Sequence, residues 1–202
     1  MSQRIAFFDF DGTITTKDTL LEFIHFSRGG IRLALGFLLN SPWLIAMKLK
    51  LISNQSAKER ILTHFFGRQP VALFEQHCNA FSLETLPSLI RPKAIAEITR
   101  LRETGATVVI VSASPENWIK HWAAQIGAEL VATRLAVFND KKGEPRLTGR
   151  IEGHNCYGEE KVSRIRQRYA LPDYTEIYTY GDTTGDKPML RLGTASFFKP
   201  FQ

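Results

Sequence analysis

Phe7-Phe8-Asp9-Phe10-Asp11-Gly12-Thr13-Ile14-Thr15 is the stretch of this sequence that decides the fold. The apolar run from Ile5 to Phe10 predicts a short strand that is buried on both faces, as in a parallel sheet. Asp9 and Asp11 stand at its carboxyl end, where buried ionised groups are costly unless they are paired or bind a cation. Because side chains alternate along an extended backbone, we expect both carboxylates to face the same way. Open α/β sheets bind ligands at this edge, so the pair indicates a metal-dependent phosphoryl-transfer site.

The composition is that of a folded protein, and the distribution of its charge does not indicate nucleic-acid binding. The chain has 202 residues, 44% of them hydrophobic, which predicts one large domain or a core domain with a small insertion. The net charge is +6, but the basic residues are scattered. Arg164, Arg166 and Arg168 alternate along an expected helix without forming one stripe, so we expect a solvated face and no nucleic-acid partner.

Two features bear on the compartment. Cys78 and Cys156 lie far apart and in no metal-ligand spacing, which favours a reduced, cytoplasmic environment. The first apolar run is short and is interrupted by Asp9 and Asp11, so it does not predict a secretory signal. No pattern in the sequence predicts an oligomeric state.

Residues 17–88 are expected to be nearly all helical. Helices are predicted over 18–26, over 56–66 with Ser56 as N-cap and Glu59 completing a capping box, and over 71–86. Residues 31–52 are unusually apolar, and Asn40-Ser41-Pro42 predicts a break that divides them into a helical hairpin. A transmembrane span is not expected, because it needs about 20 apolar residues without such a break. The hairpin either packs within a small domain or presents an apolar surface to lipid or to an apolar substrate. Arg32, Lys48 and Lys50 would flank that surface.

From residue 89 onward, strand and helix patterns alternate, which predicts a doubly wound parallel sheet. Helices are expected over 92–104, 115–126, 158–169 and 187–191, and strands over 107–111, 129–132, 177–180 and 195–198. Turn residues at 139–143 separate the runs 135–138 and 146–151, which suggests that these runs are the arms of a hairpin. Residues 1–16 and 89–202 are therefore assigned to an α/β core, and residues 17–88 to an inserted helical domain.

Three later stretches carry candidate chemistry. Ser112 lies in a strand-to-helix turn that could hold a phosphate, with Ser114 as the expected N-cap and Pro115 as the first helical residue. Lys161 lies in the first turn of a helix, where the helix dipole disfavours a cation, so we expect it to meet phosphate or the aspartates. Asp182 and Asp186 follow a strand on a glycine-containing loop, a spacing that suits Mg²⁺.

Together these stretches resemble the four motifs of the haloacid dehalogenase (HAD) superfamily in their usual order. DFDGT resembles motif I, VSAS motif II, Lys161 motif III and GDTTGD motif IV. The helical insertion between motifs I and II resembles the C1-type cap of subfamily IB members similar to phosphoserine phosphatase. The resemblance covers nearly the whole chain and implies a phosphomonoester hydrolase with an aspartyl-phosphate intermediate.

The resemblance also implies a role for each matched residue. Asp9 would be the nucleophile, and Asp11 the general acid and then the base. Mg²⁺ would be held by the carboxylates of Asp9 and Asp182 and by the backbone carbonyl of Asp11, with Asp186 holding metal-bound water or orienting Lys161. The phosphate would be bound by the remaining matched groups, namely Thr13 through its amide, Ser112, the Ala113 amide and Lys161.

The substrate is less well defined, because specificity lies in the cap. Asp18 matches the position of a cap acid that meets the substrate amine in phosphoserine phosphatases, but it is shorter. Arg60 is a candidate for their carboxylate-binding arginine, and Gly185 replaces their usual asparagine. The expected partner is a small phosphorylated metabolite, with a phosphoserine-like compound as one candidate.

Three alternatives remain open. The apolar cap resembles that of phosphatidylglycerophosphatase C-like enzymes, which implies a lipid phosphate and membrane contact through residues 31–52. A non-enzymatic, receiver-like module would be phosphorylated on an aspartate, although Asp11 and the large cap argue against it. Phosphotransfer to an acceptor other than water is the third.

Overall fold

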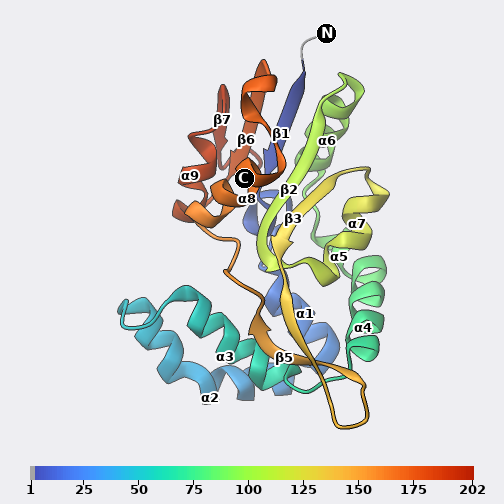
Figure 1. The fold of residues 1–202 in the computed structure, drawn as a ribbon, viewed down its shortest axis with the longest axis vertical. Coiled ribbons are helices and arrows are strands. Elements are labelled where there is room, and N and C mark those ends of the chain that lie inside the picture. Colours follow the sequence, from blue (N-terminus) through green and yellow to red (C-terminus); the bar gives the residue numbers. More distant parts are fainter. Residues whose placement is uncertain (1–2) are drawn as a thin grey trace.

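A computed structural model describes residues 3–202 and shows an α/β core with a helical insertion (Figure 1). The core sheet has five parallel strands in the order β3-β2-β1-β6-β7. They span Arg4–Phe8 (β1), Thr107–Pro115 (β2), Glu129–Thr133 (β3), Glu176–Gly181 (β6) and Ala195–Phe198 (β7). The α/β class and the parallel sheet are confirmed, and β1 is a central strand, as its apolar sequence predicts.

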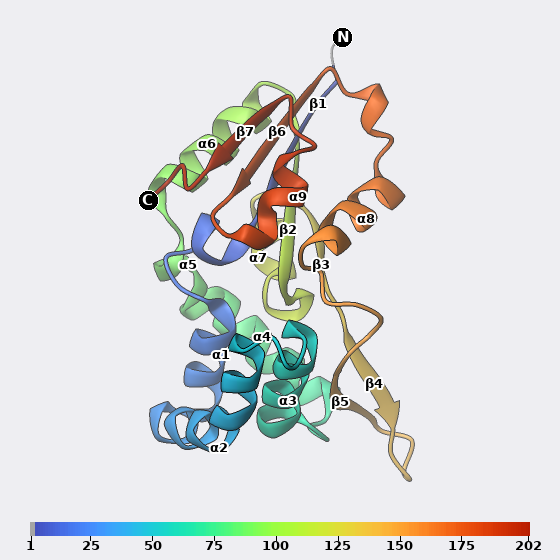
Figure 2. The ribbon, with the colours of Figure 1, turned by 90° about the vertical axis from the view of Figure 1, so that its left-hand side faces the viewer.

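Helices cover both faces of the sheet (Figures 1 and 2). One face is covered by α6 (Pro92–Glu103) and α7 (Lys120–Gln125), and the other by α8 (Glu159–Arg168) and α9 (Lys187–Leu190). A hydrophobic cluster lies under the helices on each face. Because side chains alternate along β1, Phe8 packs into the cluster on the α6–α7 face and Phe7 into the cluster on the α8–α9 face. Because the five strands are parallel, all their carboxyl ends meet at the edge of the sheet that faces the insertion.

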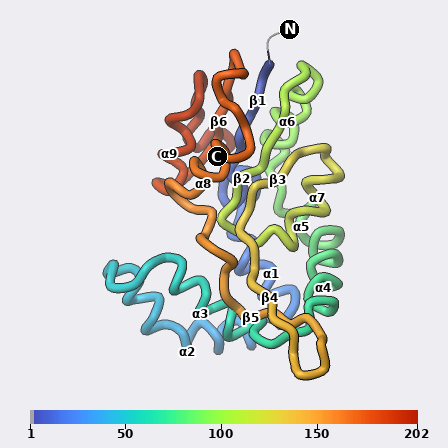
Figure 3. The backbone as a smooth tube through the Cα atoms, in the orientation of Figure 1, coloured from blue at the N-terminus to red at the C-terminus, as the bar shows by residue number. Residues whose placement is uncertain are grey.

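The insertion contains α1 (Thr19–Arg28), α2 (Gly30–Lys48), α3 (Asn54–Phe66), α4 (Val71–Glu84) and α5 (Leu86–Leu89). Its aromatic centre is continuous with the core of the sheet domain, since Phe23 stacks on Trp118 at 4.7 Å between ring centroids. Figure 3 shows α2 and α3 projecting to one side below the sheet. A predicted hairpin also joins this region: β4 (Leu135–Asn139) and β5 (Pro145–Ile151) pair antiparallel, and β5 lies against α3.

The predicted break at Asn40-Ser41-Pro42 is wrong, because α2 continues through Pro42. Proline cannot donate to the carbonyl four residues earlier, which here is that of Leu38. The Ser41 hydroxyl donates to that carbonyl instead, at 2.8 Å. The lost backbone bond is thus replaced locally, and the result is one 19-residue helix with the length and mean hydropathy (1.3) of a candidate membrane span.

Two predicted caps are also wrong. The N-cap of α3 is Ser53, whose hydroxyl accepts from the Ser56 amide at 3.0 Å, so the helix begins earlier than predicted. Ser114 caps no helix, because β2 continues to Pro115 and pairs there with Thr133 of β3. Sheet pairing overrides the local helix-start signal at this position.

Candidate active site

Asp9 follows β1 directly and is almost fully buried beside Lys161. The Lys161 ammonium lies 2.6 Å from Oδ1 of Asp9 and 2.7 Å from Oδ1 of Asp186. These contacts confirm the sequence prediction that Lys161 meets the aspartates. Lys161 is itself only 1% exposed. Its unfavourable position in the first turn of α8 is compensated by two ion pairs in a buried environment.

The protonation of this cluster reflects burial opposed by charge. Burial raises the pKa of Asp9 to about 7, while the Lys161 ammonium pulls it down. Burial would lower the pKa of Lys161, but the carboxylates of Asp9 and Asp186 outweigh it and raise that pKa. Lys161 therefore stays charged and favours the ionised form of Asp9, which is the form a nucleophile needs.

Asp182 completes a group of three carboxylates. Asp9, Asp182 and Asp186 can each place an oxygen within 4.8 Å of the other two. The Thr13 hydroxyl lies 3.1 Å from both Oδ2 of Asp9 and Oδ1 of Asp182 and so bridges them. Gly12 has φ +85°, and a Cβ there would collide with the Asp182 carboxylate, so glycine permits this close approach.

This donor set fits a hard divalent cation. Three carboxylates face one ammonium, and within residues 3–202 no ion pair is formed by Asp182. Oxygen ligands of this kind are those that Mg²⁺ prefers. The Asp186 oxygens already accept from Lys161, from the amides of Asp182 and Thr183 and from the Thr183 hydroxyl. Asp9 and Asp182 are therefore the better direct ligands, and Asp186 the better supporting residue.

Asp11 faces a different set of partners from Asp9. Its Oδ1 accepts from the amide and the hydroxyl of Thr19, at 2.7 and 2.6 Å. Its Oδ2 accepts from the Ser114 hydroxyl at 2.7 Å, with the Ser112 hydroxyl at 3.4 Å. The two carboxylates have separate hydrogen-bond partners, since β1 ends at Phe8 and residues 10–14 form a tight turn, although the charge of Asp11 still raises the pKa of Asp9. The two aspartates are thus suited to different tasks.

Lys58 is a site residue that the sequence analysis missed. It lies on α3, and its ammonium donates to the Ala113 carbonyl at 3.1 Å and to Oδ1 of Asn155 at 3.4 Å. Burial lowers the pKa of Lys58, and the charges of Asp11 and Asp18 partly offset that effect. No carboxylate in residues 3–202 forms an ion pair with Lys58, so only the longer-range charges of Asp11 and Asp18 offset its ammonium beside the loop that follows β2. A lone lysine on an amphipathic helix gives no sequence signal of such a role.

The two tentative specificity residues are placed differently. Asp18 caps α1, where its Oδ1 accepts from the amides of Leu20 and Leu21, and it lies close enough to Lys58 to influence its charge. Arg60 lies over the Trp43 ring at 5.0 Å, between α3 and α2, so the structure does not bring it to the cluster around Asp9. Gly185 packs against the Tyr157 ring, which a side chain there would displace.

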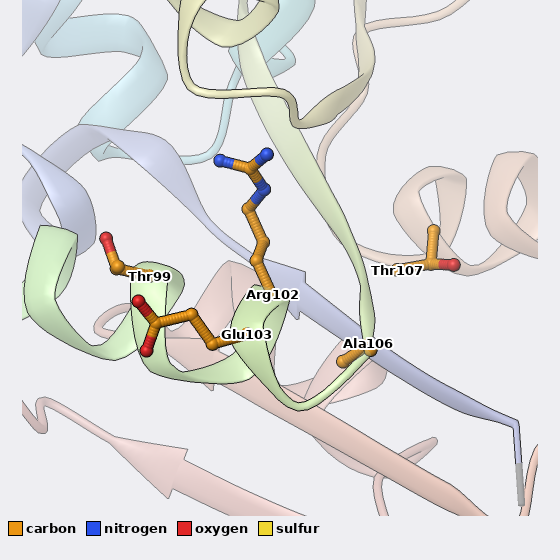
Figure 4. A pocket seen from close by; sticks show the side chains of 6 residues that line it. Thr99, Arg102, Glu103, Ala106 and Thr107 are labelled. Carbon is orange, nitrogen blue, oxygen red and sulfur yellow. The ribbon is translucent and has the colours of Figure 1, made fainter.

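A surface pocket lies far from these groups. It is lined by Thr99, Arg102, Glu103, Gly105, Ala106 and Thr107 and is shown in Figure 4. Thr107 begins β2, whereas Ser112 and Ser114 lie toward its other end. The pocket therefore opens at the edge of the sheet opposite the carboxylates and contributes nothing to the site.

Comparisons with known proteins agree with this geometry. Residues 6–191 match the family described as haloacid dehalogenase-like hydrolase. Protein CicA of Caulobacter vibrioides is 36% identical over 196 residues, covering 96% of this chain and 85% of CicA. A Mycobacterium tuberculosis protein named as a probable phosphatase is 32% identical over 212 residues, covering 98% of this chain and 70% of the relative.

Solved structures share the fold. A Bordetella pertussis protein of unknown function superimposes with a TM-score of 0.78 at 24% identity, covering 96% of this chain and 88% of that chain. A substrate-bound phosphoserine phosphatase does so with a TM-score of 0.61 at 18% identity, covering 96% and 84%. At these identities the likeness concerns the fold alone.

Proposed function

This chain belongs to the haloacid dehalogenase-like hydrolase family, and on that premise we propose that it is a Mg²⁺-dependent phosphatase of small phosphate monoesters. The observation that carries the proposal is the buried contact of Asp9 with Lys161 beside Asp182, together with a second carboxylate, Asp11, held apart from it. A nucleophile and a proton carrier in separate environments are what a two-step hydrolysis needs.

In the first step, an Asp9 oxygen forms a bond to phosphorus while the bond to the leaving alkoxide oxygen breaks. Asp11 gives the alkoxide its proton, and an aspartyl phosphate remains on Asp9. In the second step, Asp11 takes a proton from water, the water oxygen attacks phosphorus and Asp9 is released. The presence of Asp11 favours hydrolysis over a receiver-like role, because a receiver module requires no acid for a leaving group.

The charged groups around Asp9 offset the negative charge of the phosphoryl group. Lys161 and Lys58 supply two cations, one from the core and one from the insertion. The Ser112 hydroxyl and the Ala113 amide, at the end of β2, are proposed to bind phosphoryl oxygens, with the Thr13 amide as a further contact. Mg²⁺ held by Asp9, Asp182 and the Asp11 carbonyl would neutralise charge on the transferring group and fix its orientation.

The test is phosphate release from an aryl phosphate in the presence of Mg²⁺. Asp9→Asn should lower kcat by about a thousandfold or more, because the nucleophile is removed. Asp173→Asn is the matched control, since Asp173 is an exposed aspartate outside the site. Turnover by Asp9→Asn at the wild-type rate would overturn the proposal, and transfer of phosphate to an added alcohol would identify a phosphotransferase instead.

Two substrate classes compete. The position of Asp18 and Lys58 near the site favours a small metabolite that carries both an amine and a second anionic group, such as a phosphoserine-like compound. The exposed apolar surface of α2 favours a lipid phosphate instead. A screen that compares phosphorylated amino acids and sugars with lysophosphatidate and phosphatidylglycerophosphate separates the two classes.

A further inference from the structure

Helix α2 is apolar on two opposite faces, one of which is exposed to solvent. Leu33, Phe37 and Leu44 pack against the core of the insertion. The opposite face carries apolar side chains spaced by four, three, four, three and four residues, which places them on one side of the helix. They are Ile31 (80% exposed), Leu35 (55%), Leu38 (69%), Pro42, Ile45 (57%) and, at the C-cap, Leu49 (65%).

The charge around this stripe has one sign. Residues 23–58 contain no aspartate or glutamate, and they contain the basic residues Arg28, Arg32, Lys48, Lys50 and Lys58. By the angular spacing of an α-helix, Arg32 falls on one flank of the stripe and Lys48 on the other, and Lys50 follows just beyond the end of α2. Trp43, 44% exposed, lies on the same flank as Arg32. Basic and indole side chains beside an apolar stripe complement the headgroup region of an anionic bilayer.

We propose that the exposed face of α2 docks on the surface of an anionic lipid membrane. The helix lies in the plane of the interface rather than across the bilayer, because its other face is committed to α1 and α3. Phe37 packs near Phe65 of α3 at 6.3 Å between ring centroids, and Arg60 of α3 lies over Trp43. Helix α3 also carries Lys58 to the site. When α2 is docked, α3 would therefore be the helix that lies between the lipid surface and the proposed catalytic groups.

The proposal does not depend on phosphatase activity, because its test measures binding. The full chain is sedimented with vesicles of phosphatidylcholine, with and without phosphatidylglycerol. We expect binding to the anionic vesicles, a loss of about tenfold or more in Leu38→Glu, and no loss in Leu83→Glu, a matched control at an exposed leucine of α4 (54%). Circular dichroism of each variant verifies that the fold is kept.

Tryptophan emission gives a second readout. Trp118 and Trp122 are buried, so a blue shift on adding anionic vesicles reports on Trp43 and should disappear in Trp43→Phe. The proposal is overturned if wild-type protein does not sediment with anionic vesicles, if it binds neutral vesicles equally well, or if Leu38→Glu binds like wild type. A dimer that dissociates in Leu38→Glu without any vesicle binding would assign this face to a second copy of the chain.

Discussion

At the scale of single residues, Lys58 is the residue whose contacts most directly suggest a role in ligand binding. Its ammonium donates to two neutral acceptors and so keeps one donor for a ligand. Removing the charge in Lys58→Met should raise KM by about tenfold or more and lower kcat less, since a hydrogen bond to a charged group contributes about 1.5–3 kcal/mol. Steady-state kinetics measure this, with the exposed Lys93→Met as control. A kcat effect without a KM effect would place Lys58 in the chemical step instead.

Thr19 positions Asp11, the proposed proton carrier. Its hydroxyl accepts from the Trp118 indole at 3.1 Å, so it is oriented to donate to Asp11. Thr19→Val removes that donation, and we expect slower turnover of alkyl phosphates, which need a protonated leaving group, with a smaller effect on aryl phosphates, which do not. Thr19→Ser should restore the wild-type ratio of the two rates. Equal losses on both substrate types would show a merely structural role.

At the scale of secondary-structure elements, Pro42 has a measurable consequence. A proline inside a helix costs about 3 kcal/mol, and the Ser41 hydroxyl recovers only part of that by bonding the Leu38 carbonyl. Pro42→Ala should therefore raise the free energy of unfolding by about 1–2 kcal/mol, after allowing for the more flexible unfolded chain. Urea denaturation measures the change, and Ser41→Ala should shift it in the opposite direction. A destabilised Pro42→Ala would mean that the proline has a packing role.

The sequence predicted most elements but not the contacts between their ends. Apolar periodicity and turn residues placed β1, β6, the β4–β5 hairpin and α8, because those signals are local. The signals at Ser114 and Pro42 were also local, but β3 pairing and the Ser41 hydroxyl decided the outcome. The Asp9–Lys161 pair could be expected from an unfavourable cation at a helix start. The contacts of Asp11 and Lys58 arise only where β2, α1 and α3 converge.

At the scale of the whole molecule, the insertion and the α/β core share one hydrophobic interior. Phe23 of α1 contacts Trp118 beyond β2, and Gly149 of β5 lies so close to Thr63 of α3 that a Cβ would collide with it. We expect a single cooperative transition, with tryptophan fluorescence and far-UV circular dichroism changing together. Phe23→Ala should lower the free energy of unfolding by about 3–5 kcal/mol. Separate transitions for the two signals would show that the insertion folds on its own.

The charge balance of the site also governs the stability of the whole chain. Three carboxylates around one ammonium repel one another in the absence of a cation, so Asp182→Asn should make the metal-free protein more stable. The proposed Mg²⁺ would bind only the folded arrangement and should therefore stabilise the wild type by about 2.7 kcal/mol at a concentration a hundred times its Kd. That gain should disappear in Asp182→Asn and persist in Asp173→Asn. Thermal unfolding with Mg²⁺ and with a chelator measures both effects. Repulsion and metal binding depend on the same carboxylate. An Asp182→Asn variant that loses stability without metal would contradict the repulsion, and one that keeps the Mg²⁺ response would place the cation elsewhere.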